Sequence, residues 1–248
     1  MKSRTVTELL AWQPLAVPEI ISDGILQPGG RMVIFGRTGT WKSMLGIHTG
    51  FCISAGLPWL GFKTVQSRVL MAQVEIPEVQ LRRRVEKYVN SNGQIPADFH
   101  LLSEPFLRLD QSMHTREFEM LLASVKPQVV ILDPLYRMTS IDISKNHELE
   151  QFMDIIDRLA VKHNLATILI SHTIKQQLLD AGQQRDWIQD AVGGSYLVNW
   201  ADTMIAVEPV TDTVLDLHFL KVRAAEDEIG IVRAQVDRST LHFKKVII

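Results

Sequence analysis

The chain has 248 residues, of which 46% are hydrophobic and 22% are charged, and its formal net charge is −2 at pH 7. This composition excludes a disordered or fibrous protein, and any contact with nucleic acid needs a local basic cluster or a ring of subunits. The single cysteine, Cys52, cannot form an internal disulfide, and we expect it to be buried. Because we find no signal peptide or membrane-spanning run, we expect a cytoplasmic protein with no membrane partner and one domain over residues 1–248.

Residues 1–30 are expected to be a lead-in segment that packs on the domain. They contain a short amphipathic stretch, Val6 to Trp12, followed by three prolines and a glycine pair. We interpret Trp12 as a packing anchor in preference to a base-stacking residue. The first core strand is predicted over residues 31–35.

The next segment has the order of strand, small-residue loop and helix that a phosphate-binding loop requires. Its candidate nucleotide-binding residues are Gly36, Arg37, Thr38, Gly39, Thr40, Trp41, Lys42 and Ser43. In such a loop the backbone N–H groups and the lysine bind the phosphates of ATP, and the serine hydroxyl binds Mg²⁺. Trp41 replaces the second glycine of the motif, so we expect its side chain to point away from the nucleotide and its φ to be negative unless strain is accepted. If the indole of Trp41 blocked the site, the protein would keep its fold but would not hydrolyse ATP.

Glu75 follows a strand predicted over residues 68–74. A carboxylate at the end of a strand beside the phosphate-binding loop can accept a proton from, or orient, the attacking water, although a solvated strand-end glutamate is the alternative.

A helix predicted over residues 79–92 carries a basic run, Arg82 to Arg84 with Lys87. Such a run usually faces solvent, and a subunit-interface or DNA role is the alternative.

Asp133 ends a strand predicted over residues 128–133, whose unbroken apolar run, residues 129–132, is typical of a strand buried on both faces of a parallel sheet. Placed after a phosphate-binding loop, this pattern predicts that Asp133 and Ser43 are the metal ligands. Another buried strand, residues 166–173, brings His172 to the same edge, where it is either a sensor of the γ-phosphate or a strand-end histidine with a structural role.

A long polar loop, residues 175–192, contains Lys175, Arg185 and Trp187. Basic groups and an aromatic ring can contact a nucleic-acid backbone and stack on bases, and a surface loop without function is the alternative.

The C-terminal part is predicted as antiparallel strands over residues 213–220, 231–237 and 241–248. Lys221 and Arg223, two residues apart, project from the same side of an extended segment. They can either act on the nucleotide site of a neighbouring subunit or serve as edge-strand charges.

Together these motifs resemble the RecA-like ATPase core, most closely RepA-type and DnaB-type hexameric helicases and their AAA-domain phage or plasmid relatives. The resemblance is carried by residues 36–43, 55–61, 74–75, 131–135, 171–175, 194–195 and 221–223. It implies an α/β fold with a mostly parallel twisted sheet, flanking helices and antiparallel C-terminal strands. It also implies the following catalytic residues: Lys42, Glu75 as the base, Asp133 as the Walker B acid, His172 as the sensor, and Lys221 and Arg223 acting across a subunit boundary.

The same resemblance implies that the loop with Lys175 and Arg185 faces a central DNA channel. The expected function is therefore an ATP-hydrolysing, Mg²⁺-dependent motor that forms a ring, hexameric as in such families, and acts on single-stranded DNA as a replicative helicase. The alternatives are a recombination or regulatory RecA/KaiC-like ATPase that does not unwind DNA, and a nucleotide-binding scaffold.

Overall fold

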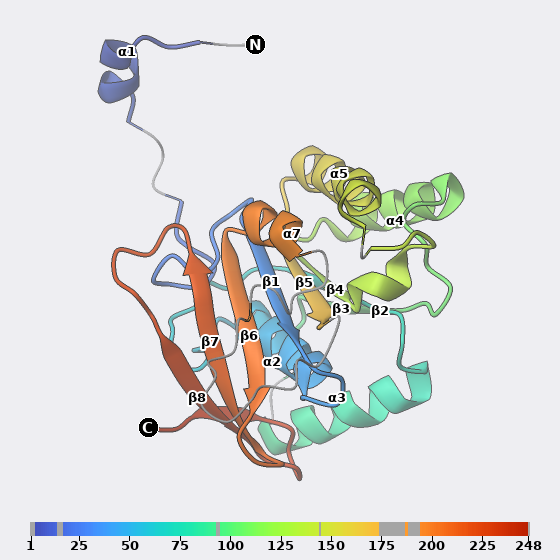
Figure 1. Cartoon of the computed structure of the whole chain (residues 1–248). Helices are drawn as coiled ribbons and strands as arrows, with labels where there is room; N and C mark the ends of the chain where they lie inside the picture. The colour runs from blue at the N-terminus through green and yellow to red at the C-terminus, as the bar shows by residue number, and fades with distance from the viewer. Residues whose placement is uncertain are drawn as a thin grey trace.

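The computed structural model describes residues 3–13, 17–92, 95–143, 145–173, 187 and 194–247. A nine-stranded sheet, in the order β3-β2-β4-β5-β1-β6-β7-β8-β9, forms the centre of the molecule (Figure 1). The strands are β1 (Arg31–Gly36), β2 (Val69–Gln73), β3 (Phe99–Ser103), β4 (Val129–Asp133), β5 (Ala166–His172), β6 (Thr203–Pro209), β7 (Val214–Val222), β8 (Ile231–Val236) and β9 (Phe243–Lys245). Strands β1 to β6 are parallel, and β7, β8 and β9 continue the sheet antiparallel, as the sequence predicted.

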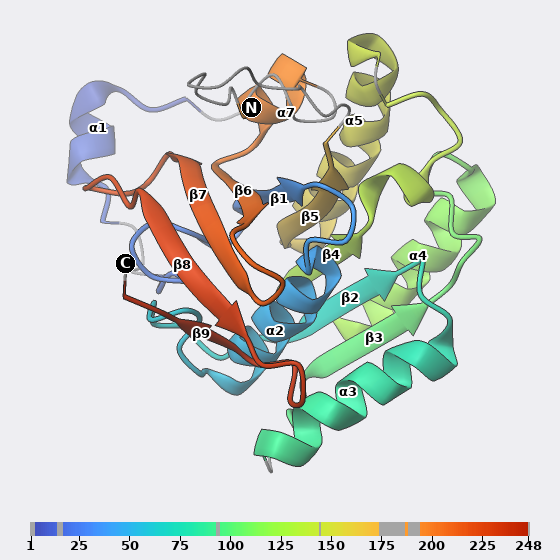
Figure 2. The same ribbon diagram turned by 60° about the horizontal axis from the view of Figure 1, so that its bottom comes forward.

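Helices cover both faces of the sheet. The helices of the described residues are α1 (Val6–Ala11), α2 (Lys42–Ala55), α3 (Glu78–Asn92), α4 (Ser112–Val125), the 3₁₀ helix η1 (Leu135–Met138), α5 (Asn146–His163) and α7 (Gly194–Trp200), of which α1 lies away from the sheet. Helices α2 and α3 pack on one face, whereas α4, α5 and α7 pack on the other. Figure 2 shows α3 beside β2 and β3, and the C-terminal strands on the other side of β1. Within the described residues, no helix is both long enough and apolar enough to cross a membrane.

The alternation of side chains along β1 explains the two layers. Met32 and Ile34 belong to the core beneath α2, whereas Val33 and Phe35 belong to the core beneath α5 and α7, because successive side chains of a strand point to opposite faces. A helix that begins directly after β1 can then return along the sheet. Gly46 allows this close approach, since a Cβ at that position would meet the side chain of Ile170 on β5.

The parallel strands end at one edge of the sheet. Gly36 on β1 is level with His172 on β5, and Gln73 on β2 is level with Asp133 on β4. In an open α/β sheet, ligands bind outside the carboxyl ends of the strands, so this edge is where a site is expected.

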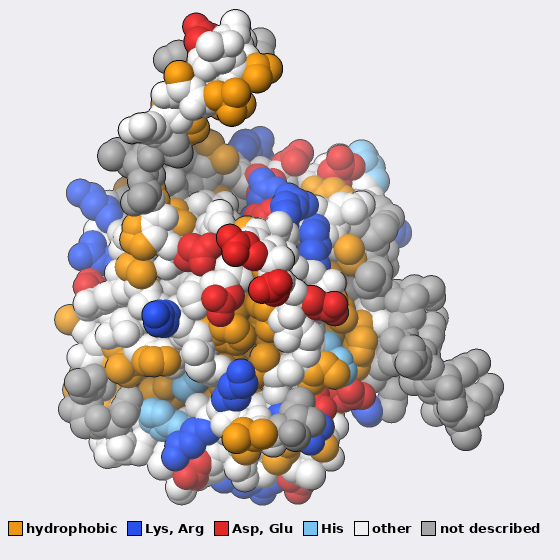
Figure 3. Space-filling view, turned by 90° about the vertical axis from the view of Figure 1, so that its left-hand side faces the viewer, with side chains coloured by type: hydrophobic (Ala, Val, Ile, Leu, Met, Phe, Trp, Pro, Cys, Tyr) orange, Lys and Arg blue, Asp and Glu red, His pale blue; other side chains and the backbone are white. Residues whose placement is uncertain are grey.

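The N-terminal segment differs from expectation. Helix α1 has a capping box between Thr5 and Glu8 but none of its residues is buried, and it projects from the body of the protein (Figures 1 and 3). Trp12 is 48% exposed, and the guanidinium of Arg4 lies 4.4 Å from the centroid of its ring. The expectation that Trp12 anchors the segment is therefore wrong, because the apolar residues of this short helix meet no core surface. The later part of the segment does pack on the domain, since Ile20, Ile21, Ile25 and Leu26 are buried in the core.

Candidate functional site

The loop between β1 and α2 has the backbone of an anion-binding turn. Gly36 packs against the carbonyl oxygen of Val207, where a Cβ would lie only 2.6 Å away, and Gly39 has a φ of +80°. Among the described residues, no side chain caps the N-terminus of α2. The first N–H groups of the helix therefore keep the donors that a phosphate group can accept from.

Trp41 occupies the last position of this loop with φ 61° and ψ 8°, in the left-handed region. The expected negative φ is wrong: the tryptophan adopts the conformation that glycine favours and accepts the strain of doing so. Its indole Nε1 donates to the backbone oxygen of Asp212, 2.9 Å away in the β6–β7 turn. The half-buried ring packs on the core and joins the loop to the C-terminal strands.

Lys42 is buried beneath the loop. Its Nζ donates to the backbone oxygen of Arg37 at 2.5 Å and to the Oγ1 of Thr40 at 3.3 Å. Burial lowers the pKa of Lys42 to about 8, and the charges of Asp133 and Glu75 partly oppose this shift. The ammonium thus lies among carbonyl and hydroxyl oxygens in the position where a phosphate group needs a cation.

Asp133 and Ser43 meet at the start of α2. Asp133 is 1% exposed, and burial raises the pKa of its carboxyl to about 6 despite hydrogen bonds from Ser43 and Gln73. Its Oδ1 is buried and, within the part of the chain that the structure describes, has no hydrogen-bond partner. A buried carboxylate oxygen without a donor, beside a serine hydroxyl, fits the oxygen ligands that Mg²⁺ prefers.

Gln73, which belongs to none of the sequence motifs, orders this end of β2. Its Nε2 lies 3.4 Å from Oδ2 of Asp133, and its Oε1 accepts hydrogen bonds from the backbone N–H groups of Glu75 and Ile76 at 2.8 and 2.6 Å. The amide is fully buried. A polar residue at the end of an otherwise apolar strand was the available signal.

Glu75 is exposed at the mouth of the site and contacts Tyr136, a residue outside the predicted catalytic set. The hydroxyl of Tyr136, in η1, donates to Oε1 of Glu75 at 3.0 Å. His172 lies on the other side of this tyrosine, with the two ring centroids 5.2 Å apart and the planes at 71°. The Nδ1 of His172 is also 3.4 Å from Oγ1 of Thr38 in the loop. Burial, followed by the charge of Lys42, lowers the pKa of His172.

Residues 38–43 of the loop line one cleft of about 760 Å³ together with Glu75, Asp133 and His172. Its outer wall includes Arg83, Arg84 and Lys87 from α3, together with Gln80. The spacing of these four residues places them on one face of the helix. Arg82 lies on another face and pairs with Glu86 at 2.8 Å. The basic run is therefore not simply a solvated face, and the positions 80, 83, 84 and 87 were the sequence signal for this.

The sequence model of the AAA domain matches residues 1–177, which is more than half of the chain. The chain belongs to the AAA domain family. Its fold and its phosphate-binding loop are those of a RecA-like P-loop ATPase core. No match is found among curated proteins.

Solved structures share this fold at low sequence identity. One of them, described as an ATPase domain, has a TM-score of 0.68 and 11% identity over 89% of this chain and 86% of that one. A DnaB-like replicative helicase, solved for its interactions with primase, has a TM-score of 0.66 and 12% identity over 89% of this chain and 58% of that one. A KaiC-like protein from Pyrococcus horikoshii has a TM-score of 0.63 and 11% identity over 92% of this chain and 94% of that one.

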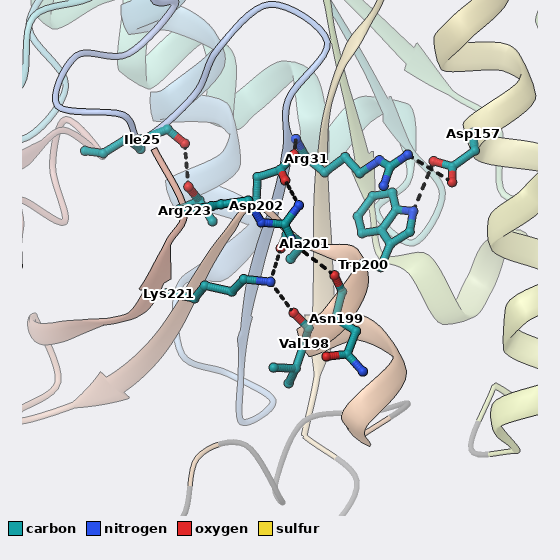
Figure 4. Close-up of polar contacts among 11 residues, drawn as sticks. Ile25, Arg31, Asp157, Val198, Asn199, Trp200, Ala201, Asp202, Lys221 and Arg223 are labelled. Atoms are coloured by element: carbon teal, nitrogen blue, oxygen red, sulfur yellow. Dashed lines mark hydrogen bonds and ion pairs between the residues drawn. The ribbon is translucent and has the colours of Figure 1, made fainter. Parts of the chain in front are cut away.

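Lys221 and Arg223 lie beside the amino ends of the parallel strands, at the end opposite to the P-loop, and Figure 4 shows their contacts with residues 198–202. Lys221 is level with Met204 at the start of β6, whereas the P-loop follows the end of the parallel strand β1. The Nζ of Lys221 donates to the backbone oxygens of Val198 and Ala201 at 2.7 and 2.6 Å. Arg223 also contacts this region: its guanidinium donates to the carboxylate of Asp202 at 2.8 Å and to the backbone oxygen of Asn199 at 3.3 Å. Both side chains therefore donate hydrogen bonds at the C-terminal end of α7.

The predicted nucleic-acid residues Lys175 and Arg185 lie outside the described residues. Trp187 is described, and it is 9% exposed, with its ring centroid 5.0 Å from that of His218. The suggestion that Trp187 stacks on bases is therefore wrong, because its ring packs in the core formed with α5 and α7.

Proposed function

We propose that this chain is an ATP-hydrolysing motor of the RepA type, which assembles as a ring, hexameric as in such helicases, and moves along single-stranded DNA. The observation that carries the proposal is the cleft in which Lys42, Ser43, Asp133 and Glu75 meet at the carboxyl edge of the sheet. A catalytic set of this kind needs a lysine for the phosphates, a metal-binding pair and a carboxylate near the attacking water.

Each residue has a proposed role in hydrolysis. The N–H groups of residues 36–43 and the ammonium of Lys42 hold the triphosphate, while Ser43 and Asp133 hold Mg²⁺. The metal held by these two residues would supply positive charge that offsets the negative charge of the phosphates. Glu75 then orients the attacking water and accepts its proton. His172, between Thr38 and Tyr136, responds to the presence of the γ-phosphate.

Cations from two sources complete the site in this proposal. Arg83, Arg84 and Lys87 supply positive charge from the same chain, because they line the same cleft as the P-loop. Lys221 and Arg223 lie at the opposite end of the parallel strands from their own P-loop, and we propose that they act on the site of a neighbouring subunit. Charge supplied across a boundary makes hydrolysis depend on assembly. Lys175 and Arg185 are the proposed DNA contacts.

The test is unwinding of a forked DNA duplex by the purified protein with ATP. We expect strand separation and a rise in ATP hydrolysis when single-stranded DNA is added. Lys42→Ala should abolish both, whereas Lys63→Ala, an exposed lysine away from the cleft, should leave both unchanged. A rate of ATP hydrolysis that does not change when single-stranded DNA is added would contradict the proposal.

The second candidate is a recombination or regulatory ATPase that uses the nucleotide as a switch. It is favoured by the likeness to the KaiC-like protein, which extends over 94% of that chain. In that case the protein would turn over ATP and assemble but would not unwind a fork. A nucleotide-binding scaffold, the third candidate, would show equal background ATPase with and without Lys42→Ala. The glycine-like conformation of Trp41 argues against it, since the loop backbone keeps its shape.

A further inference from the structure

Tyr136 lies between the ends of three parallel strands. Gln73 on β2 pairs with Asp133 on β4, so the chain that leaves each strand at this edge emerges beside the other. Glu75 comes two residues after the first of these, and Tyr136 comes three residues after the second. Strand β5, which ends at His172, lies on the other side of β4. A side chain above the end of β4 can therefore touch groups from both neighbouring strands.

The short helix η1 turns Tyr136 toward the site. Leu135 and Met138 are fully buried, because residues three apart in a 3₁₀ helix lie on the same side. Tyr136, between them, is 37% exposed and points instead at the mouth of the cleft, where its hydroxyl meets Glu75. The turn is held in place by the hydrogen bond from the backbone N–H of Leu109 to the backbone oxygen of Met138, 2.7 Å long.

The tyrosine hydroxyl both donates and accepts. It donates to Oε1 of Glu75 at 3.0 Å and accepts a hydrogen bond from Nε of Arg137 at 3.2 Å. A phenol whose oxygen accepts a hydrogen bond from a guanidinium becomes a stronger hydrogen-bond donor through its own O–H group. The two bonds of Tyr136 therefore strengthen each other. Within the part of the chain that the structure describes, the second oxygen, Oε2, accepts no hydrogen bond, so it is available to a water molecule. The ring is supported from the side by the edge-to-face contact with His172.

We infer that Tyr136 is a positioning residue that fixes the carboxylate of Glu75 for proton abstraction. The inference rests on the proposed function, because it assigns a task only if Glu75 is the base. A glutamate side chain has several freely rotating bonds, and an exposed one samples many orientations. The hydrogen bond from Tyr136 restricts Glu75 to orientations that leave one oxygen free for the water. Tyr136 acts through Glu75 and does not itself contact the phosphates.

The test is a double-mutant cycle between Tyr136→Phe and Glu75→Gln, measured as single-turnover ATP hydrolysis. Phenylalanine keeps the ring and its contact with His172 and removes only the hydroxyl. We expect Tyr136→Phe to lower the hydrolysis rate about tenfold and to leave KM and the Kd for a non-hydrolysable ATP analogue unchanged. In the Glu75→Gln protein the same change should have no further effect, because the base that it positions is absent.

Tyr196→Phe is the matched control. Tyr196 lies on α7, its ring is half-buried, and its hydroxyl has no hydrogen bond within the described residues. This variant should hydrolyse ATP at the wild-type rate. Equal losses from Tyr136→Phe in both backgrounds, an unchanged rate, or a changed nucleotide Kd would overturn the inference and leave the proposed function standing. A wild-type protein that binds ATP without hydrolysing it would overturn both.

Discussion

The indole N–H of Trp41 donates to the backbone oxygen of Asp212 over 2.9 Å, which joins the P-loop to the turn between β6 and β7. The two residues are 171 positions apart. Asp212 is itself tied to Arg238, whose guanidinium lies 3.3 Å from its carboxylate. A residue that departs from the motif of the phosphate-binding loop thus links this loop to the C-terminal strands.

Trp41→Gly should destabilise the protein less than Trp41→Ala. Both changes lose the indole hydrogen bond and the packing of the ring, together about 2–4 kcal/mol. Only glycine also relieves the left-handed strain, worth about 1–2 kcal/mol at φ 61°. Urea unfolding at 25 °C should therefore rank the free energies of unfolding as wild type, Gly, then Ala. An alanine variant as stable as the glycine variant would refute the strain argument.

Asp133→Asn should stabilise the ligand-free protein at pH 7 while abolishing ATP hydrolysis. Burial raises the pKa of Asp133 to about 6 in the folded state, above its value of 3.8 in the unfolded state. The folded protein therefore holds the proton more tightly, and its stability falls as pH rises from about 4 to 6, by roughly 2–3 kcal/mol. The gain from Asp133→Asn should appear in urea unfolding at pH 7 and disappear near pH 4.

Asp216→Asn is the control with the opposite sign. The ion pair with Arg233, 2.7 Å long, lowers the pKa of Asp216. The stability that it contributes is present above the unfolded pKa and is lost as pH falls through the folded one. This variant should be less stable than wild type at pH 7. If both asparagine variants changed stability in the same direction, the electrostatic account of Asp133 would fail.

The affinity for nucleotide should fall as pH rises through about 8. Burial lowers the pKa of Lys42 to about 8, so the free protein loses the ammonium above that pH. The Kd for a fluorescent ATP analogue should then rise by up to about tenfold per pH unit, because the phosphates require the charged form. A Lys42→Arg protein that still binds the analogue should not show this rise, since a guanidinium stays protonated.

A mixture of Lys42→Ala and Arg223→Ala proteins should recover ATPase activity that neither has alone. If Arg223 acts on the site of a neighbouring subunit, a mixed assembly contains interfaces at which both groups are intact. At these interfaces the Arg223→Ala subunit supplies the P-loop and the Lys42→Ala subunit supplies Arg223. Random mixing in equal amounts should restore about one quarter of the interfaces. Arg223 acting only within its own chain, where it binds Asp202, would give no recovery. Mixing Lys42→Ala with wild type provides the reference for exchange between assemblies.

The parallel core and most of the proposed catalytic set follow from local patterns in the sequence. Asp133 and His172 each end an apolar run, and Glu75 follows one closely, so in a parallel sheet all three lie at the edge where β1 runs into the P-loop. These assignments need only local hydrophobicity and the rule that parallel strands end together. The antiparallel C-terminal strands follow from similar alternation.

Contacts between distant segments depend instead on how the folded chain packs. The indole of Trp41, at a positive φ, is bonded to Asp212 in the distant β6–β7 turn. Tyr136 contacts Glu75 because β2 and β4 are neighbours. Likewise, packing of α3 makes Arg84 face the cleft, and the β6–β7 pairing places Lys221 under α7. A sequence pattern specifies which side chains share a face of an element. Which partner that face meets is fixed only when elements far apart in the chain come together.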